Sequence, residues 1–134
     1  MHIFLGYRFT GENPEELKVN LRAICSSLEK AGHRIYCSLW EEHFYKENNY
    51  TADQIYEHTI KKMQDCDAFL ALVKSNDRSK GMDKEKEEAV RLNKKIYLAI
   101  KRGLDFQDFR NVANETIEWD NLEELYILLS KLKS

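Results

Sequence analysis

The chain has 134 residues, of which 43% are hydrophobic and 33% are charged. This length and composition are typical of one globular unit with a single core, so we expect residues 1–134 to form one domain. The formal net charge is only -2, which argues against a surface built to bind nucleic acid or an anionic membrane. Without a long apolar run or a signal-peptide pattern at its start, the chain is expected to be cytoplasmic.

The three cysteines are Cys25, Cys37 and Cys66. Their number is odd, their spacing fits no metal site, and each stands beside apolar residues. We therefore expect reduced, buried thiols and no metal site.

Short runs rich in β-branched and aromatic residues alternate with amphipathic stretches. The predicted strands are 3–7, 34–38, 68–73, 96–100 and 116–119. This alternation is typical of a parallel sheet covered by helices on both faces. The predicted fold class is α/β, a flavodoxin-like or Rossmann-like three-layer sandwich with a five-stranded, mainly parallel sheet.

Helix start signals precede the amphipathic stretches. Pro14 suits a first helical turn, and Gly32 ends the first helix. The predicted N-caps of the first, second and last helices are Asn13, Thr51 or Asp53, and Asp120 or Asn121.

Two connections, 39–50 and 101–115, are long and contain several aromatic residues. Such loops in a compact α/β domain are more often functional than decorative. In open α/β sheets the ligand crevice lies beyond the carboxyl ends of the strands, where the strand order reverses. We expect the segments 7–11, 40–43 and 74–82 to converge there.

Glu85 stands where an apolar residue is expected. The segment 82–92 reads as a helix, and Met82, Glu85, Ala89 and Leu92 fall on one inward face. A carboxylate on a buried face costs desolvation energy, so it is either paired or functional. Periodicity alone leaves both interpretations open.

The turn 74–82 connects the third predicted strand to the helix of Glu85. Hydroxyl groups, a glycine and a helix N-terminus in one turn favour a bound anion, with Ser79 and Gly81 as candidates for phosphate or carboxylate binding. The alternative is a capping loop in which Ser79 is a plain N-cap. No nucleoside-triphosphatase phosphate loop and no GxGxxG motif is present, which disfavours ATP hydrolysis and dinucleotide binding by that motif.

The first strand ends in a loop that carries Gly6, Tyr7 and Phe9, and its glycines suggest close approach of the backbone to a ligand, or simply a structural turn. After the second strand, Trp40 and Glu41 suit an aromatic wall with a polar tip against a planar base. For Trp40 the alternative is a lid over the core.

These features together resemble the nucleoside 2-deoxyribosyltransferase-like proteins, which include the nucleotide N-glycosidases. The resemblance covers about the first 100 residues and is most specific in the pattern Ser79-x-Gly81-Met82-x-x-Glu85-x-x-x-Ala89. It implies cleavage or transfer at the N-glycosidic bond of a nucleoside or nucleoside monophosphate, with Glu85 as the nucleophile and no metal or organic cofactor. It also implies a homo-oligomer, such as a dimer, whose subunits complete each other's sites. The implied substrate-binding residues are Gly6, Tyr7, Phe9, Trp40, Glu41, Ser79, Gly81 and Met82.

The chain departs from this family at two positions, and one of them is Glu87, where relatives often have glycine. Relatives carry an aspartate where this chain has Thr59, and His58 beside it is a possible auxiliary group, as are Glu57 and Asp77. Two alternative functions therefore stay open: a nucleotide-sensing module without catalysis, and an NAD glycohydrolase of the Toll/interleukin-receptor-like class.

Overall fold

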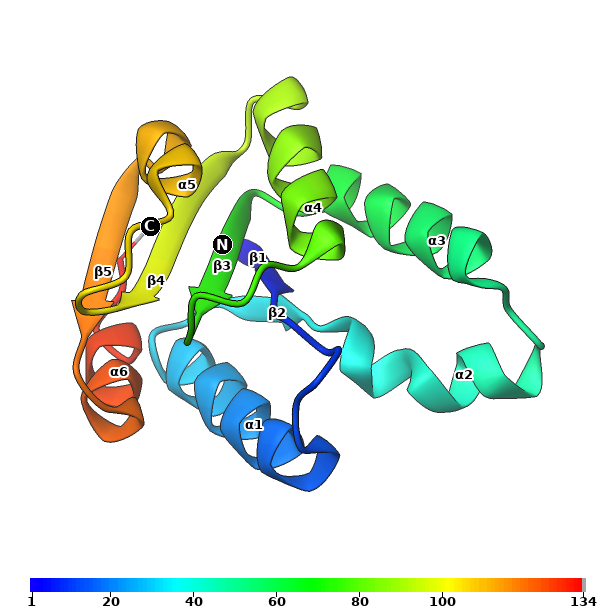
Figure 1. Ribbon diagram of the computed structural model, residues 1–134, viewed down its shortest axis with the longest axis horizontal. Helices are drawn as coiled ribbons and strands as arrows, with labels where there is room; N and C mark the ends of the chain where they lie inside the picture. Colours follow the sequence, from blue (N-terminus) through cyan, green and yellow to red (C-terminus); the bar gives the residue numbers. More distant parts are fainter. Residues whose placement is uncertain (134) are drawn as a thin grey trace.

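The structure is a computed structural model, and it describes residues 1–133. Five strands form one sheet in the spatial order β2-β1-β3-β4-β5, and every neighbouring pair is parallel (Figure 1). The strands are β1 His2–Gly6, β2 Arg34–Tyr36, β3 Ala68–Val73, β4 Lys95–Lys101 and β5 Glu115–Trp119. All five predicted strands are confirmed to within two residues at each end, because their apolar runs fill the core.

Helices cover both faces of the sheet (Figure 1). One face carries α1 Pro14–Lys30 and α6 Leu122–Leu129, and the other carries α3 Ala52–Asp65, α4 Lys80–Arg91 and α5 Gln107–Val112. The 3-10 helix η1 Ser38–Glu41 and the short α2 Glu42–Glu47 follow β2. The predicted three-layer α/β fold is confirmed. None of the helices within residues 1–133 is both long and apolar enough to cross a membrane.

The predicted helix caps are also observed. Asn13 Oδ1 accepts a hydrogen bond from the Glu16 N–H at 3.0 Å. Of the paired alternatives, Thr51 and Asn121 are the caps, rather than Asp53 and Asp120. Sequence reasoning missed η1 and α2 within the connection 39–50, and α5 within 101–115.

The strand order indicates that the expected ligand crevice lies between β1 and β3. β1 and β3 are neighbours, yet the chain leaves β1 toward α1 on one face and leaves β3 toward α4 on the other (Figure 1). Such a reversal opens a crevice at the carboxyl ends of the two strands. Gly6 ends β1, and Ser79 begins the helix after β3.

Candidate active site

Glu85 lies at this crevice, directly over the end of β1. Its Oε1 lies 3.0 Å from the point that a Cβ on Gly6 would occupy, so the absent side chain of Gly6 makes room for the carboxyl group. Glu85 is half-buried, and burial raises the pKa of its carboxyl group to about 8. Burial is the cause of this shift, and none of the ion pairs found within residues 1–133 includes Glu85.

The two arginines that could have made Glu85 a structural ion pair are engaged elsewhere. Arg8 lies 3.7 Å from Asp77, and Arg91 pairs with Glu88 on its own helix. A half-buried carboxyl group without a partner is the kind of group that active sites retain.

Three elements bring polar groups toward Glu85. Tyr7 follows β1, and its hydroxyl lies 2.9 Å from Ser38 Oγ. Burial raises the pKa of Tyr7, and the nearby charges of Cys37 and Glu85 raise it further. Burial also raises the pKa of Tyr56 on α3, with Glu88 and Glu85 adding to it. Glu85 therefore shares its surroundings with the end of β1, the end of β2 and α3.

The start of α4 confirms that Ser79 is an N-cap. Its hydroxyl oxygen accepts a hydrogen bond from the Met82 N–H at 3.2 Å, and within residues 1–133 the hydroxyl donates no hydrogen bond. Gly81 is exposed, and a Cβ there would meet only Ser79 Oγ at 3.8 Å. The side chain of Met82 is buried in the core. Phosphate binding by this turn stays a prediction.

Two cations that sequence reasoning did not select lie beside Ser79. Arg8 and Lys74 line the same hollow as Ser79 and Met82. Of the three segments expected to converge, 7–11 and 74–82 meet there, whereas no residue of 40–43 lines it. Lys74 lies 3.3 Å from Glu12. The sequence could have indicated both cations, because each one follows the end of a predicted strand and the strand ends line the crevice.

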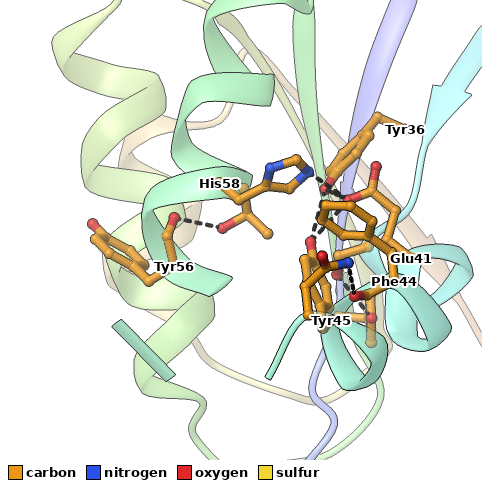
Figure 2. Close-up of polar contacts among 10 residues, drawn as sticks. Tyr36, Glu41, Phe44, Tyr45, Tyr56 and His58 are labelled. Carbon is orange, nitrogen blue, oxygen red and sulfur yellow. Dashed lines mark hydrogen bonds and ion pairs between the residues drawn. The ribbon is translucent and has the colours of Figure 1, made fainter. Parts of the chain in front are cut away.

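Glu41 is the centre of a second polar cluster (Figure 2). Its Oε2 accepts hydrogen bonds from the hydroxyls of Tyr36 at 3.0 Å and Tyr45 at 2.9 Å, and it lies 2.7 Å from His58 Nε2. Burial raises the pKa of Tyr45 to about 12. The structure thus joins two residues, Glu41 and His58, that the sequence analysis selected separately. We call Tyr36, Glu41, Tyr45 and His58 the Glu41 cluster.

Other predicted site residues lie apart from Glu85 or have their polar groups engaged. Thr59 is buried, and its hydroxyl donates to the Tyr56 carbonyl at 2.8 Å. Trp40 is 43% exposed and lies against Arg22 of α1, the helix on the opposite face of the sheet from α4. Phe9 is 51% exposed on the loop after β1. In the structure the Trp40 ring therefore contacts α1. Its stacking on a base stays a prediction.

No metal-binding cluster of three or more histidine, cysteine, aspartate or glutamate residues occurs in the part of the chain that the structure describes. The groups around Glu85 that the structure brings together are hydroxyls, a thiol and the backbone of Gly6. Such groups can bind and orient a polar organic molecule.

Comparison with known proteins identifies relatives by structure and none by sequence. A scan against models of protein families finds no match, and a search of curated proteins finds none either. The structure of the CMP N-glycosidase BcmB from Clostridium botulinum matches with a TM-score of 0.70 and 20% identity, covering 96% of this chain and 97% of that chain. A 2-deoxyribosyltransferase from the psychrotolerant bacterium Bacillus psychrosaccharolyticus matches with a TM-score of 0.67 and 15% identity, covering 94% of this chain and 90% of that chain.

Both matches extend over nearly the whole chain, beyond the 100 or so residues that carry the resemblance in sequence. At these identities they establish the fold. The chain has the fold of the nucleoside 2-deoxyribosyltransferase-like proteins, as the sequence pattern predicted.

Proposed function

We propose that the protein is an enzyme that cleaves or transfers at the N-glycosidic bond of a nucleoside or nucleoside monophosphate. The observation that carries this proposal is Glu85, a half-buried carboxyl group without a counter-ion that lies over Gly6 at the crevice. The names of the two structural neighbours, a CMP N-glycosidase and a 2-deoxyribosyltransferase, support it.

In the proposed mechanism the ionised Glu85 attacks C1′ of the sugar. An oxygen of the carboxylate bonds to C1′ while the bond from C1′ to the base breaks, and the base leaves with the electron pair and takes up a proton. Water or an acceptor base then attacks C1′ and releases the carboxylate. Positive charge that develops at C1′ favours the ionised form of Glu85, which burial alone disfavours.

Among the two substrate classes we favour nucleoside monophosphates, because of the groups around Ser79. Ser79 and Gly81 stand at the N-terminus of a 12-residue helix, which favours negative charge. Arg8 and Lys74 line the same hollow, where they pair with Asp77 and Glu12. We therefore propose that the phosphate binds between Ser79 and these cations, with Gly81 contributing its backbone N–H.

Ser79→Ala is expected to raise KM for a monophosphate about tenfold and to change KM for the matching nucleoside by less than about twofold. The substitution also removes an N-cap, which costs about 1 kcal/mol of stability. Asn121→Ala removes the cap of α6 and serves as the control for that cost. Equal losses for both ligands in steady-state kinetics would remove phosphate recognition from this turn.

Product analysis tests the proposed function directly. Pooled nucleosides, nucleoside monophosphates and NAD are incubated with the protein, and liquid chromatography detects released bases. A free base from a nucleoside or its monophosphate is the expected result. Nicotinamide from NAD alone would favour the NAD glycohydrolase alternative. Binding without turnover would favour the sensing module, for which the engaged hydroxyl of Thr59 is the supporting observation.

We also propose that the active form is a homo-oligomer that associates through the outer face of α1. Val19 is 67% exposed there, in a groove that it lines together with Arg22 and Ala23, and the exposed Trp40 lies against Arg22. We place the association surface at this groove, where Val19 and Ala23 lie side by side.

Val19→Glu is expected to convert the oligomer to monomers, because a charged side chain would replace an apolar contact at the interface. Size-exclusion chromatography with light scattering measures the mass. Val90→Glu, at an exposed valine of α4, is the matched control and is expected to leave the mass unchanged. A wild-type protein that is monomeric at all concentrations contradicts the proposal.

A further inference from the structure

The Glu41 cluster has a feature that a purely structural contact does not need. Three donors converge on one carboxylate oxygen, Oε2, whereas no hydrogen bond within residues 1–133 occupies Oε1. The side chains of Glu41 and His58 are 28% and 26% exposed, so both are accessible from solvent. Figure 2 shows Tyr36, Tyr45 and His58 pointing to the same carboxylate, from β2, α2 and α3.

The cluster lies on the same face of the sheet as Glu85. Tyr36 is paired with Phe4 in the register of β2 and β1, and their rings are 5.2 Å apart. Phe4 and Gly6 are two residues apart on β1, so they face the same side, and Glu85 lies over Gly6. One strand spacing and two residues separate Gly6 from Tyr36, which is roughly 8 Å between their Cα atoms.

A second connection runs through Tyr7. The charge of Tyr45, like that of Glu85, acts on the hydroxyl of Tyr7 and contributes to its raised pKa. Tyr7 therefore lies near enough to both Glu85, the proposed nucleophile, and Tyr45 of the Glu41 cluster for their charges to affect its hydroxyl. Glu85 on α4 and His58 on α3 thus belong to two helices that pack on the same face of the sheet.

The proposed reaction needs a proton at the base, and the groups closest to Glu85 are poor sources. The raised pKa values of Tyr7 and Tyr56 make both hydroxyls weak acids. The Thr59 hydroxyl is engaged by a backbone carbonyl, and Asp77 is exposed beside Arg8. An imidazole is the group whose ordinary pKa suits this task near neutral pH.

We propose that His58 donates the proton to the departing base and that Glu41 positions the imidazole. This inference rests on the proposed glycosidic-bond chemistry. Protonated His58 keeps Nε2–H on Glu41 and gives the proton at Nδ1 to a ring nitrogen or carbonyl oxygen at the outer edge of the base. The electron pair of the bond between C1′ and the base moves into the ring, so the base leaves neutral. His58 then regains a proton from solvent.

The groups that face His58 come from every element packed against it. They are Tyr36 of β2, Glu41 of η1, Phe44 and Tyr45 of α2, and Tyr50 of the following connection, with Glu57 and Lys61 beside it on α3. Glu41 is the single carboxylate among them that bonds to the ring.

His58→Gln is expected to lower kcat about 100-fold to 1,000-fold on whichever nucleotide with an uncharged base the wild type cleaves. It is also expected to abolish the decline of kcat/KM at high pH that a required acid produces. On nicotinamide mononucleotide, whose base leaves neutral without a proton, the expected loss is below about threefold. His43→Gln, at the exposed histidine of α2, is the matched control and should behave as wild type.

Glu41→Gln and Tyr45→Phe separate positioning from folding. Glu41→Gln should lower kcat less than His58→Gln does, and the double variant should be no slower than His58→Gln alone. Tyr45→Phe keeps the aromatic packing, removes one donor to Glu41 and is expected to lower kcat several-fold without changing the pH profile.

Three results would overturn the inference: equal loss on both kinds of base, an unchanged decline at high pH in His58→Gln, or wild-type kcat in folded Tyr45→Phe together with additive losses in the double variant. A wild type that releases no base from any substrate refutes the proposed function, and this inference with it.

Discussion

Glu85→Gln is expected to abolish base release while leaving the protein at least as stable as the wild type. Glutamine keeps the shape of the side chain but is no nucleophile, so the covalent step is lost. The free energy of unfolding should rise or stay the same, because glutamine, which carries no charge to desolvate, replaces a carboxyl group that has no counter-ion. Chromatography of released base and thermal unfolding on one preparation measure both effects.

The stability difference should depend on pH in a defined direction. The pKa of Glu85 is raised from 4.5 to about 8 in the folded protein. The folded state therefore binds this proton more tightly than the unfolded state, and the free energy of unfolding of the wild type falls as pH rises from 4.5 through 8. Glu85→Gln lacks this fall. The two proteins should melt alike near pH 4 and differ by on the order of 2 kcal/mol near pH 9.

The same pKa predicts how activity responds to pH. If the ionised carboxylate is the nucleophile, the residual kcat/KM of His58→Gln, which lacks the proposed acid, should rise with pH through about 8 without a later decline. Glu87→Gln, at an exposed glutamate of the same helix, is the control and should retain the wild-type profile. An active Glu85→Gln, or an inactive one with a sharply lowered melting temperature, contradicts the assignment of Glu85 as a nucleophile.

The strands were predictable because each is an apolar run that fills the core. The missed helices lack the signals that mark the others. No side chain caps η1, α2 or α5, and α5 begins after Phe106, whose backbone is in the left-handed region with φ of 44°. Where Asn13, Thr51 or Asn121 supplies a cap, the start of the helix was predicted.

The candidate site was predictable where it depends on local pattern. Glu85 interrupts an apolar face, which a sequence displays directly. The bond between Glu41 and His58 joins positions 17 residues apart and depends on how η1 and α3 pack, which no local pattern encodes. Trp40 was expected to face a base because 39–50 was read as a loop, whereas it belongs to η1 and lies against Arg22.

Gly6→Ala is expected to impair both the fold and the site. A Cβ on residue 6 would lie 2.5 Å from Phe69 Cε1 and 3.0 Å from Glu85 Oε1. Phe69 is fully buried and packs near Phe4, so its ring has no free space to enter. Alanine normally stabilises a strand relative to glycine by about 0.5–1 kcal/mol, but overpacking costs about 1–3 kcal/mol and should dominate.

Gly81→Ala is expected to stabilise the protein, whereas Gly6→Ala is expected to destabilise it. A Cβ on residue 81 would meet only Ser79 Oγ at 3.8 Å, so the gain in helix propensity should raise stability by up to about 1 kcal/mol. Thermal unfolding of both variants should therefore shift in opposite directions. In Gly6→Ala the carboxyl group of Glu85 must also move, and a displacement of about 1 Å at a reacting group can lower kcat about 100-fold. If Gly6→Ala melts and reacts like the wild type, the carboxyl group of Glu85 does not lie against Gly6 and the proposed nucleophile loses its position.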